Sequence, residues 1–93
     1  MDIYRAFVER LAAVPAPRDA INPYAGDGPA ATRRDNLVLY LTRMASRRPT
    51  VLLVGEAPGY RGCGVTGVPF TSRAVLLGEP SPFGLFGAAA GLA

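Results

Sequence analysis

One short segment carries the residue types that could do chemistry. Residues 51–70 read VLLVGEAPGYRGCGVTGVPF, an apolar run that leads into a glycine-rich loop containing Glu56. A carboxylate just beyond the end of a buried strand can orient or deprotonate a water molecule. Gly55 and Gly59 let a ligand approach the backbone closely, and Pro58 stiffens the loop and favours fixed backbone N–H donors. We therefore expect a site in this loop, with Glu56 as its candidate catalytic residue.

Two phosphate-binding patterns and a zinc site do not fit the sequence. A P-loop requires a lysine, and the chain has none. Residues 62–67 match the dinucleotide pattern GxGxxG, but Val68-Pro69-Phe70 follows where a helix should begin. With one cysteine and no histidine, an internal disulfide is impossible and a protein zinc site is nearly excluded.

The two motifs in this segment resemble a known family. The pentapeptide GEAPG at 55–59 after an apolar strand, followed by GVPF at 67–70 and a helix, is similar to the first active-site motif of the uracil-DNA glycosylase superfamily. The closest pattern is that of the branches that read GEAPG and then GxPF. Asn22-Pro23-Tyr24 and the two expected helices also resemble that family's N-terminal layout, so the resemblance covers residues 20–80. It implies an α/β class, specifically the N-terminal part of a three-layer α/β/α fold.

The resemblance implies base excision, in which uracil or another deaminated base is flipped out of DNA and its N-glycosidic bond is hydrolysed. Glu56 matches the carboxylate that would position water and stabilise the sugar cation. Phe70 matches the aromatic residue on which the flipped base stacks. The backbone of Ala57, Pro58 and Gly59 would line the base pocket.

The chain also departs from the family pattern. The GEAPG branch usually carries an iron–sulfur cluster on four cysteines, and Cys63 is the one cysteine here, so we expect no cluster, metal or other cofactor. The family's later histidine motif has no counterpart, because the chain contains no histidine. We therefore leave the excised base unassigned and expect the 93-residue chain to be inactive alone.

The charge pattern allows contact with nucleic acid without establishing it. All ten basic residues are arginine, and the net charge is +3. The exclusive use of arginine fits a GC-rich coding bias as well as phosphate recognition, and the two are compatible. Arg61 and Arg73 flank the loop and could meet phosphates, while a solvated surface role explains them equally well. The expected partner is DNA with a deaminated base. No apolar run is long enough to cross a membrane and the N-terminus is unlike a secretory signal, so the expected location is the cytoplasm.

Periodicity and turn residues predict the elements that must position this loop. We expect helices over 2–14 and from Thr32 to Pro49, a buried strand over 50–54, a glycine-rich loop over 55–68 and a short helix over 74–77. The apolar face expected for the first helix is Ile3, Phe7 and Leu11 with Tyr4 and Val8 beside them, and that for the second is Leu37, Tyr40, Leu41 and Met44. Thr32 to Asp35 resembles a capping box. A doubly buried strand needs neighbouring strands, and no second strand is visible. We therefore expect residues 1–93 to be one incomplete domain, the alternative being a helical unit whose strand pairs in an oligomer.

Two functions of different class remain open from the sequence. The first is a truncated glycosylase-like enzyme, and the second is a non-catalytic module that holds a nucleotide or partner with the same loop. Glu56 could also be a structural loop carboxylate, and Phe70 a core residue. Cys63 is expected to be incidental.

Overall fold

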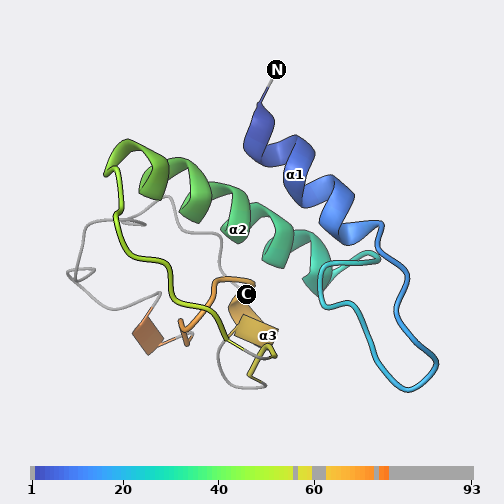
Figure 1. Ribbon diagram of the computed structural model, residues 1–93. Coiled ribbons are helices and arrows are strands. Elements are labelled where there is room, and N and C mark those ends of the chain that lie inside the picture. Colours follow the sequence, from blue (N-terminus) through green and yellow to red (C-terminus); the bar gives the residue numbers. More distant parts are fainter. Residues whose placement is uncertain (1, 56, 60–62, 73, 76–93) are drawn as a thin grey trace.

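The fold is organised around one long central helix. The computed structural model describes residues 2–55, 57–59, 63–72 and 74–75. Within them lie α1 (Ile3–Ala12), α2 (Pro29–Ser46) and the short α3 (Cys63–Thr66). Helix α1 packs on one side of α2 and α3 on another, as Figure 1 shows. Helix α2 therefore connects the N-terminal part of the chain to the glycine-rich loop.

Helix α1 confirms the predicted N-terminal helix, but only part of its expected apolar face is buried. Asp2 caps it, because its Oδ1 accepts the backbone N–H of Tyr4 at 2.9 Å and of Arg5 at 3.2 Å. Val8 is fully buried, whereas Ile3 and Phe7 are exposed. The expectation is confirmed for Tyr4, Val8 and Leu11 and wrong for Ile3 and Phe7, because α2 covers the adjacent stripe. That stripe is formed by Tyr4, Val8, Leu11 and Ala12.

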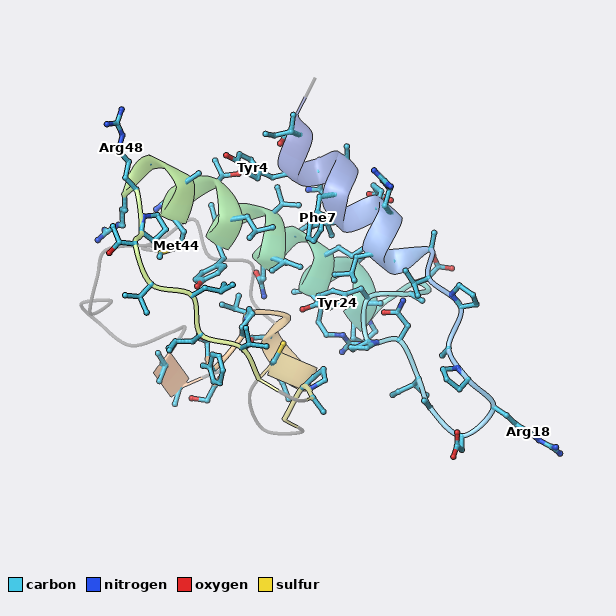
Figure 2. All side chains as sticks on the ribbon, viewed as in Figure 1. Tyr4, Phe7, Arg18, Tyr24, Met44 and Arg48 are labelled. Carbon is cyan, nitrogen blue, oxygen red and sulfur yellow. The ribbon has the colours of Figure 1, made fainter. Side chains whose placement is uncertain are left out.

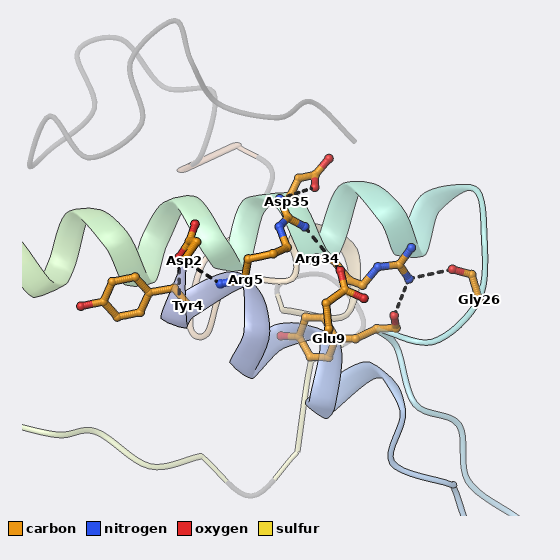
Figure 3. Close-up of polar contacts among 8 residues, drawn as sticks. Asp2, Tyr4, Arg5, Glu9, Gly26, Arg34 and Asp35 are labelled. Atoms are coloured by element: carbon orange, nitrogen blue, oxygen red, sulfur yellow. Dashed lines mark hydrogen bonds and ion pairs between the residues drawn. The ribbon is translucent and has the colours of Figure 1, made fainter.

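Helix α2 begins at Pro29 and not at Thr32, so the predicted capping box is wrong. Proline suits the first helical position, because its φ is preset and its missing N–H would have no partner there. Asp35 does not turn back toward Thr32; its Oδ1 accepts a hydrogen bond from Arg5 Nη2 at 2.9 Å and so links α1 to α2 (Figure 3). The predicted apolar face is confirmed, with Leu37 buried beside Val38.

The loop between α1 and α2 is held by side chains that bond to backbone. Asn22 Nδ2 donates to the carbonyl of Leu11 (2.8 Å), in the last turn of α1, and to that of Val14 (3.0 Å), two residues beyond the end of the helix. Arg34 Nη1 donates to the carbonyls of Tyr24 and Gly26, both at 2.7 Å (Figure 3). Tyr24 is therefore fixed against α2 by its own backbone.

Residues 51–54 do not form a strand in the part of the chain that the structure describes. Val51, Leu52, Leu53 and Val54 are 75%, 84%, 71% and 82% exposed, and the segment has no regular secondary structure. The expected burial is wrong here for a physical reason: no described segment lies alongside it as a strand to pair with its backbone. The described residues are thus helical, and the expected α/β sheet is not among them.

The glycine-rich segment contains an element that the sequence did not predict. Residues 63–66 form α3, where a continuous loop was expected. Farther on, Ser72 Oγ accepts the N–H of Val75 at 3.3 Å, which agrees with a helix start near Ser72. Residues 74 and 75 of the predicted 74–77 helix are helical, and residues 76 and 77 lie outside the described residues.

Candidate functional site

The two sequence motifs line one cavity. Its volume is about 560 Å³, and its lining includes Pro69 and Phe70 of the GVPF motif together with Gly55 and the 57–59 segment of GEAPG. The complete described lining is Leu53, Val54, Gly55, Ala57, Pro58, Gly59, Cys63, Pro69 and Phe70. This volume falls in the ~300–1,000 Å³ range of small-molecule sites. The lining is mostly apolar, which suits a flat ring more than a charged group.

Phe70 stands on a strained turn. Thr71 N donates to Val68 O at 3.3 Å, which closes a four-residue turn with Pro69 at its second position and Phe70 at its third. The φ of Phe70 is 59°, in the left-handed region that such turns usually give to glycine. The side chain is 66% exposed. Phe70 thus adopts a costly backbone conformation in the lining of the cavity, although the residue is not buried in the core.

Thr66 ties the two ends of this turn together. It is fully buried, and its Oγ1 accepts the N–H of Val68 at 3.0 Å and donates to the carbonyl of Thr71 at 2.8 Å. Val68 is also fully buried and packs against Leu39, Tyr40 and Met44 of α2. The turn is therefore anchored at its base while the ring of Phe70 remains outside the core.

The opposite wall of the cavity is joined to α3 by backbone. Gly64 N donates to Gly59 O at 2.7 Å, so the end of the GEAPG motif lies against α3. A Cβ on Gly64 would come within 2.7 Å of the same Gly59 oxygen, so this approach requires glycine. The chain on both sides of the cavity is thus supported by α3.

Tyr24 and Cys63 meet behind the cavity. The Tyr24 hydroxyl donates to Gly67 O at 2.6 Å and lies 3.5 Å from Cys63 Sγ. Burial raises the pKa of Tyr24 well above its usual value, and the hydrogen bond and charge of Cys63 add to this rise, while Arg33 opposes it. The Tyr24 hydroxyl therefore stays protonated and remains a donor at neutral pH.

The structure brings together the predicted base-binding residues, since Ala57, Pro58, Gly59 and Phe70 all line the cavity. Glu56, Arg61 and Arg73 lie outside the described residues. The chain neighbours of Glu56, Gly55 and Ala57, both line the cavity.

Two residues of the site were missed or undervalued by sequence reasoning. Cys63, expected to be incidental, lines the cavity, and Tyr24 supports it from a distance of 39 residues along the chain. The Asn22-Pro23-Tyr24 tripeptide was a signal for the position of Tyr24, but no local pattern shows that its hydroxyl reaches Gly67. Figure 2 shows Tyr24 at the α3 end of α2, with Tyr4 on the side of α1.

Comparison with known proteins adds no neighbour: the chain matches no family model, no curated protein and no solved structure. Among the described residues, no helix has both the length and the apolarity needed to span a bilayer. Nor do three or more potential metal-binding side chains (His, Cys, Asp or Glu) gather in that part of the chain.

Proposed function

We propose that this chain is part of a uracil-DNA glycosylase-like enzyme, which binds a flipped, deaminated base of DNA in the cavity between the GEAPG and GVPF motifs. The observation that carries the proposal is the shared cavity: residues 55–59 and 67–70 are separated along the chain, yet Gly55 and Phe70 line the same hollow. That juxtaposition is what a base-excision site would require of these motifs.

The environment of Phe70 supports a role in base capture. An exposed aromatic ring beside an apolar cavity can stack on a planar base, an interaction worth about 1–3 kcal/mol. Its left-handed φ costs free energy that burial does not repay. A strained, exposed aromatic residue at a cavity is more readily explained by ligand binding than by folding.

The reaction itself is assigned to Glu56 by the same proposal. A carboxylate between Gly55 and Ala57 would act on the water and on the positive charge that develops on the sugar. The exposed segment 51–54 would be a strand of an α/β sheet, since its apolar side chains on both faces need cover from both sides. The partner is DNA, and the cytoplasm is the location that goes with it.

The test is excision of uracil from single-stranded and duplex oligonucleotides. It uses the 93-residue chain and the product of its full natural reading frame, each with Glu56→Ala and Phe70→Ala variants. In the active form, Glu56→Ala should lower the single-turnover rate by about 10²–10⁴-fold and leave affinity nearly unchanged. Phe70→Ala should weaken binding of the uracil-containing strand. Uracil excision by Glu56→Ala at the parental rate would refute the catalytic assignment.

A second candidate function has one observation in its favour. The four exposed apolar side chains of 51–54 would suit a non-catalytic module that binds a partner. Absence of excision of any deaminated base by both forms, together with uracil-independent binding, would favour this module over the enzyme.

A further inference from the structure

We propose that Tyr24 and Asn36 are positioning residues that hold Phe70 over the cavity by fixing the backbone just before its turn. This inference rests on the proposed function for its consequence in base capture. The claim that Tyr24 and Asn36 fix the turn of Phe70 does not depend on that function and can be tested without DNA.

Phe70 depends on its backbone for its position. Because Phe70 is 66% exposed, the surrounding side chains restrain its ring little, and the direction of the ring is set by the Val68–Thr71 turn. The left-handed φ of Phe70 would relax if that turn loosened. Whatever fixes residues 66–68 therefore fixes the ring.

Tyr24 holds Gly67, the second of these residues, from the loop between α1 and α2. Its ring is 7% exposed and packs with Val8, Leu37 and Val38, so its position is set by the main core. From there its hydroxyl donates to Gly67 O at 2.6 Å. Tyr24 thus transmits the rigidity of the α1–α2 core to the residue before Val68.

Asn36 holds the neighbouring carbonyl from α2. It is fully buried, and its Nδ2 donates to Thr66 O at 2.8 Å. Its Oδ1 is also buried and has no hydrogen-bond partner among the described residues, which costs stability. An apolar residue of similar size would remove this unsatisfied oxygen but would leave the buried carbonyl of Thr66 without the Asn36 donor, so the two effects on stability largely cancel. The amide therefore serves the contact with Thr66 more than the stability of the core.

The two contacts act on a segment already pressed against α2. Gly67 has a φ of 80°, and a Cβ there would come within 2.7 Å of the Arg33 Cα. The adjacent carbonyls of Thr66 and Gly67 thus each accept a hydrogen bond where the backbone contacts α2. One donor comes from α2 and the other from the loop between α1 and α2. Thr66 then passes this restraint to both ends of the turn through its Oγ1.

The first experiment measures the ring directly. The chain contains no tryptophan, so Phe70→Trp places a single reporter on the turn. In that background Tyr24→Phe and Asn36→Leu should each increase the amplitude of the nanosecond component of the fluorescence anisotropy decay by about twofold. Tyr4→Phe is the matched control, because Tyr4 also packs on the core but lies on α1. Unchanged decays in both test variants would overturn the proposal.

The second experiment separates positioning from general stability. The probe is a single-stranded oligonucleotide with one uracil, compared with the same strand carrying thymine. Tyr24→Phe should weaken uracil-dependent binding by roughly 3- to 10-fold, the effect of one lost hydrogen bond. Asn36→Leu should weaken it similarly while the midpoint of thermal unfolding stays near that of the parent. A stability loss in Asn36→Leu as large as its binding loss would show a merely structural role.

A double-mutant cycle completes the test. If Tyr24 acts through Phe70, adding Tyr24→Phe to Phe70→Ala should weaken binding no further, within about twofold. Fully additive losses would overturn positioning through the ring. If the parent binds the uracil and thymine strands equally, the proposed function fails, while the anisotropy measurement still decides whether Tyr24 and Asn36 hold the turn.

Discussion

The ring of Phe70 lies against the α-carbon of Gly55, so that a Cβ on Gly55 would meet Phe70 Cζ at 3.2 Å and Cε1 at 3.4 Å. This contact joins the two motifs across the cavity. It also explains why a residue without a side chain is needed at position 55 if the ring is to stay where it is.

Gly55→Ala should therefore change the cavity more than the stability. The exposed ring can yield by the few tenths of an ångström that the new methyl group requires, so we expect the free energy of unfolding to stay within about 1 kcal/mol. Binding of a uracil-containing strand should weaken. The measurement is chemical denaturation beside fluorescence titration. In a Phe70→Ala background the binding effect should vanish; if it persists, the methyl group obstructs the ligand and does not act through the ring.

Gly67→Ala should be far more damaging, because two costs combine. The residue has a φ of 80°, and its Cβ would overlap the backbone of Arg33, coming within 2.8 Å of the carbonyl carbon. Gly26→Ala is the matched control, with a φ of 93° and nothing within 4 Å of its Cβ. We expect a loss of about 1–2 kcal/mol for Gly26→Ala from backbone strain. For Gly67→Ala we expect about 3 kcal/mol or more, measured by urea denaturation. Equal losses in the two variants would mean that the loop moves freely off α2.

The helices were predictable from the sequence because they depend on local signals. Proline and periodic apolar residues locate α1 and α2 well. The errors concern which side chains of α1 are buried and at which residue α2 begins. The start of α2 was missed because Thr32 offered a plausible cap, although Pro29 is better suited to a first helical position. Ile3 and Phe7 were misjudged because the buried stripe depends on where α2 crosses α1, which no window of α1 contains.

The site was predictable in part, for a related reason. The motifs at 55–59 and 67–70 contain most of the residues that line the cavity. They could be recognised because loop glycines and an aromatic residue form a local sequence pattern. The contacts of Tyr24 with Gly67 and of Asn36 with Thr66 span 43 and 30 residues, and nothing in the local sequence encodes them. The segment 51–54 has the composition of a buried strand, yet burial requires partner strands that the described residues do not provide.

Tyr24 should make the protein less stable at alkaline pH. A tyrosine in the unfolded chain ionises near pH ~10, whereas burial raises the pKa of Tyr24 in the folded state above that value. The folded state therefore keeps the proton after the unfolded state has lost it. Its contribution to the free energy of unfolding is complete below pH ~10 and falls as the pH rises beyond it.

This alkaline loss should be smaller in Tyr24→Phe, which has no hydroxyl to ionise, than in the parent. The measurement is the midpoint of urea denaturation from about pH 8 to about pH 11, a range that spans the ionisation of tyrosine in the unfolded chain. Tyr4→Phe is the matched control, because it removes a tyrosine hydroxyl from α1, away from the Cys63–Gly67 segment. The same slope in Tyr24→Phe as in the parent would place the alkaline loss on another group.

Replacing Phe70 should affect stability and binding differently, since its ring contributes to ligand binding while its backbone conformation lowers the stability of the fold. Phe70→Gly removes a ring that is only partly buried and relieves the left-handed φ of 59°, so its free energy of unfolding should equal or exceed that of the parent by up to about 1 kcal/mol. Phe70→Ala removes the same ring but keeps a Cβ in the strained conformation, and it should be about 1 kcal/mol less stable than Phe70→Gly. Both variants should bind a uracil-containing strand about 10-fold more weakly or worse, because both lack the stacking ring. Urea denaturation and binding titration of the parent and the two variants distinguish the explanations. If Phe70→Gly unfolds at a much lower urea concentration than the parent, Phe70 is a core residue and the strained turn serves folding. If Phe70→Gly is stable but no longer binds, the backbone strain is the cost of presenting the ring to a ligand.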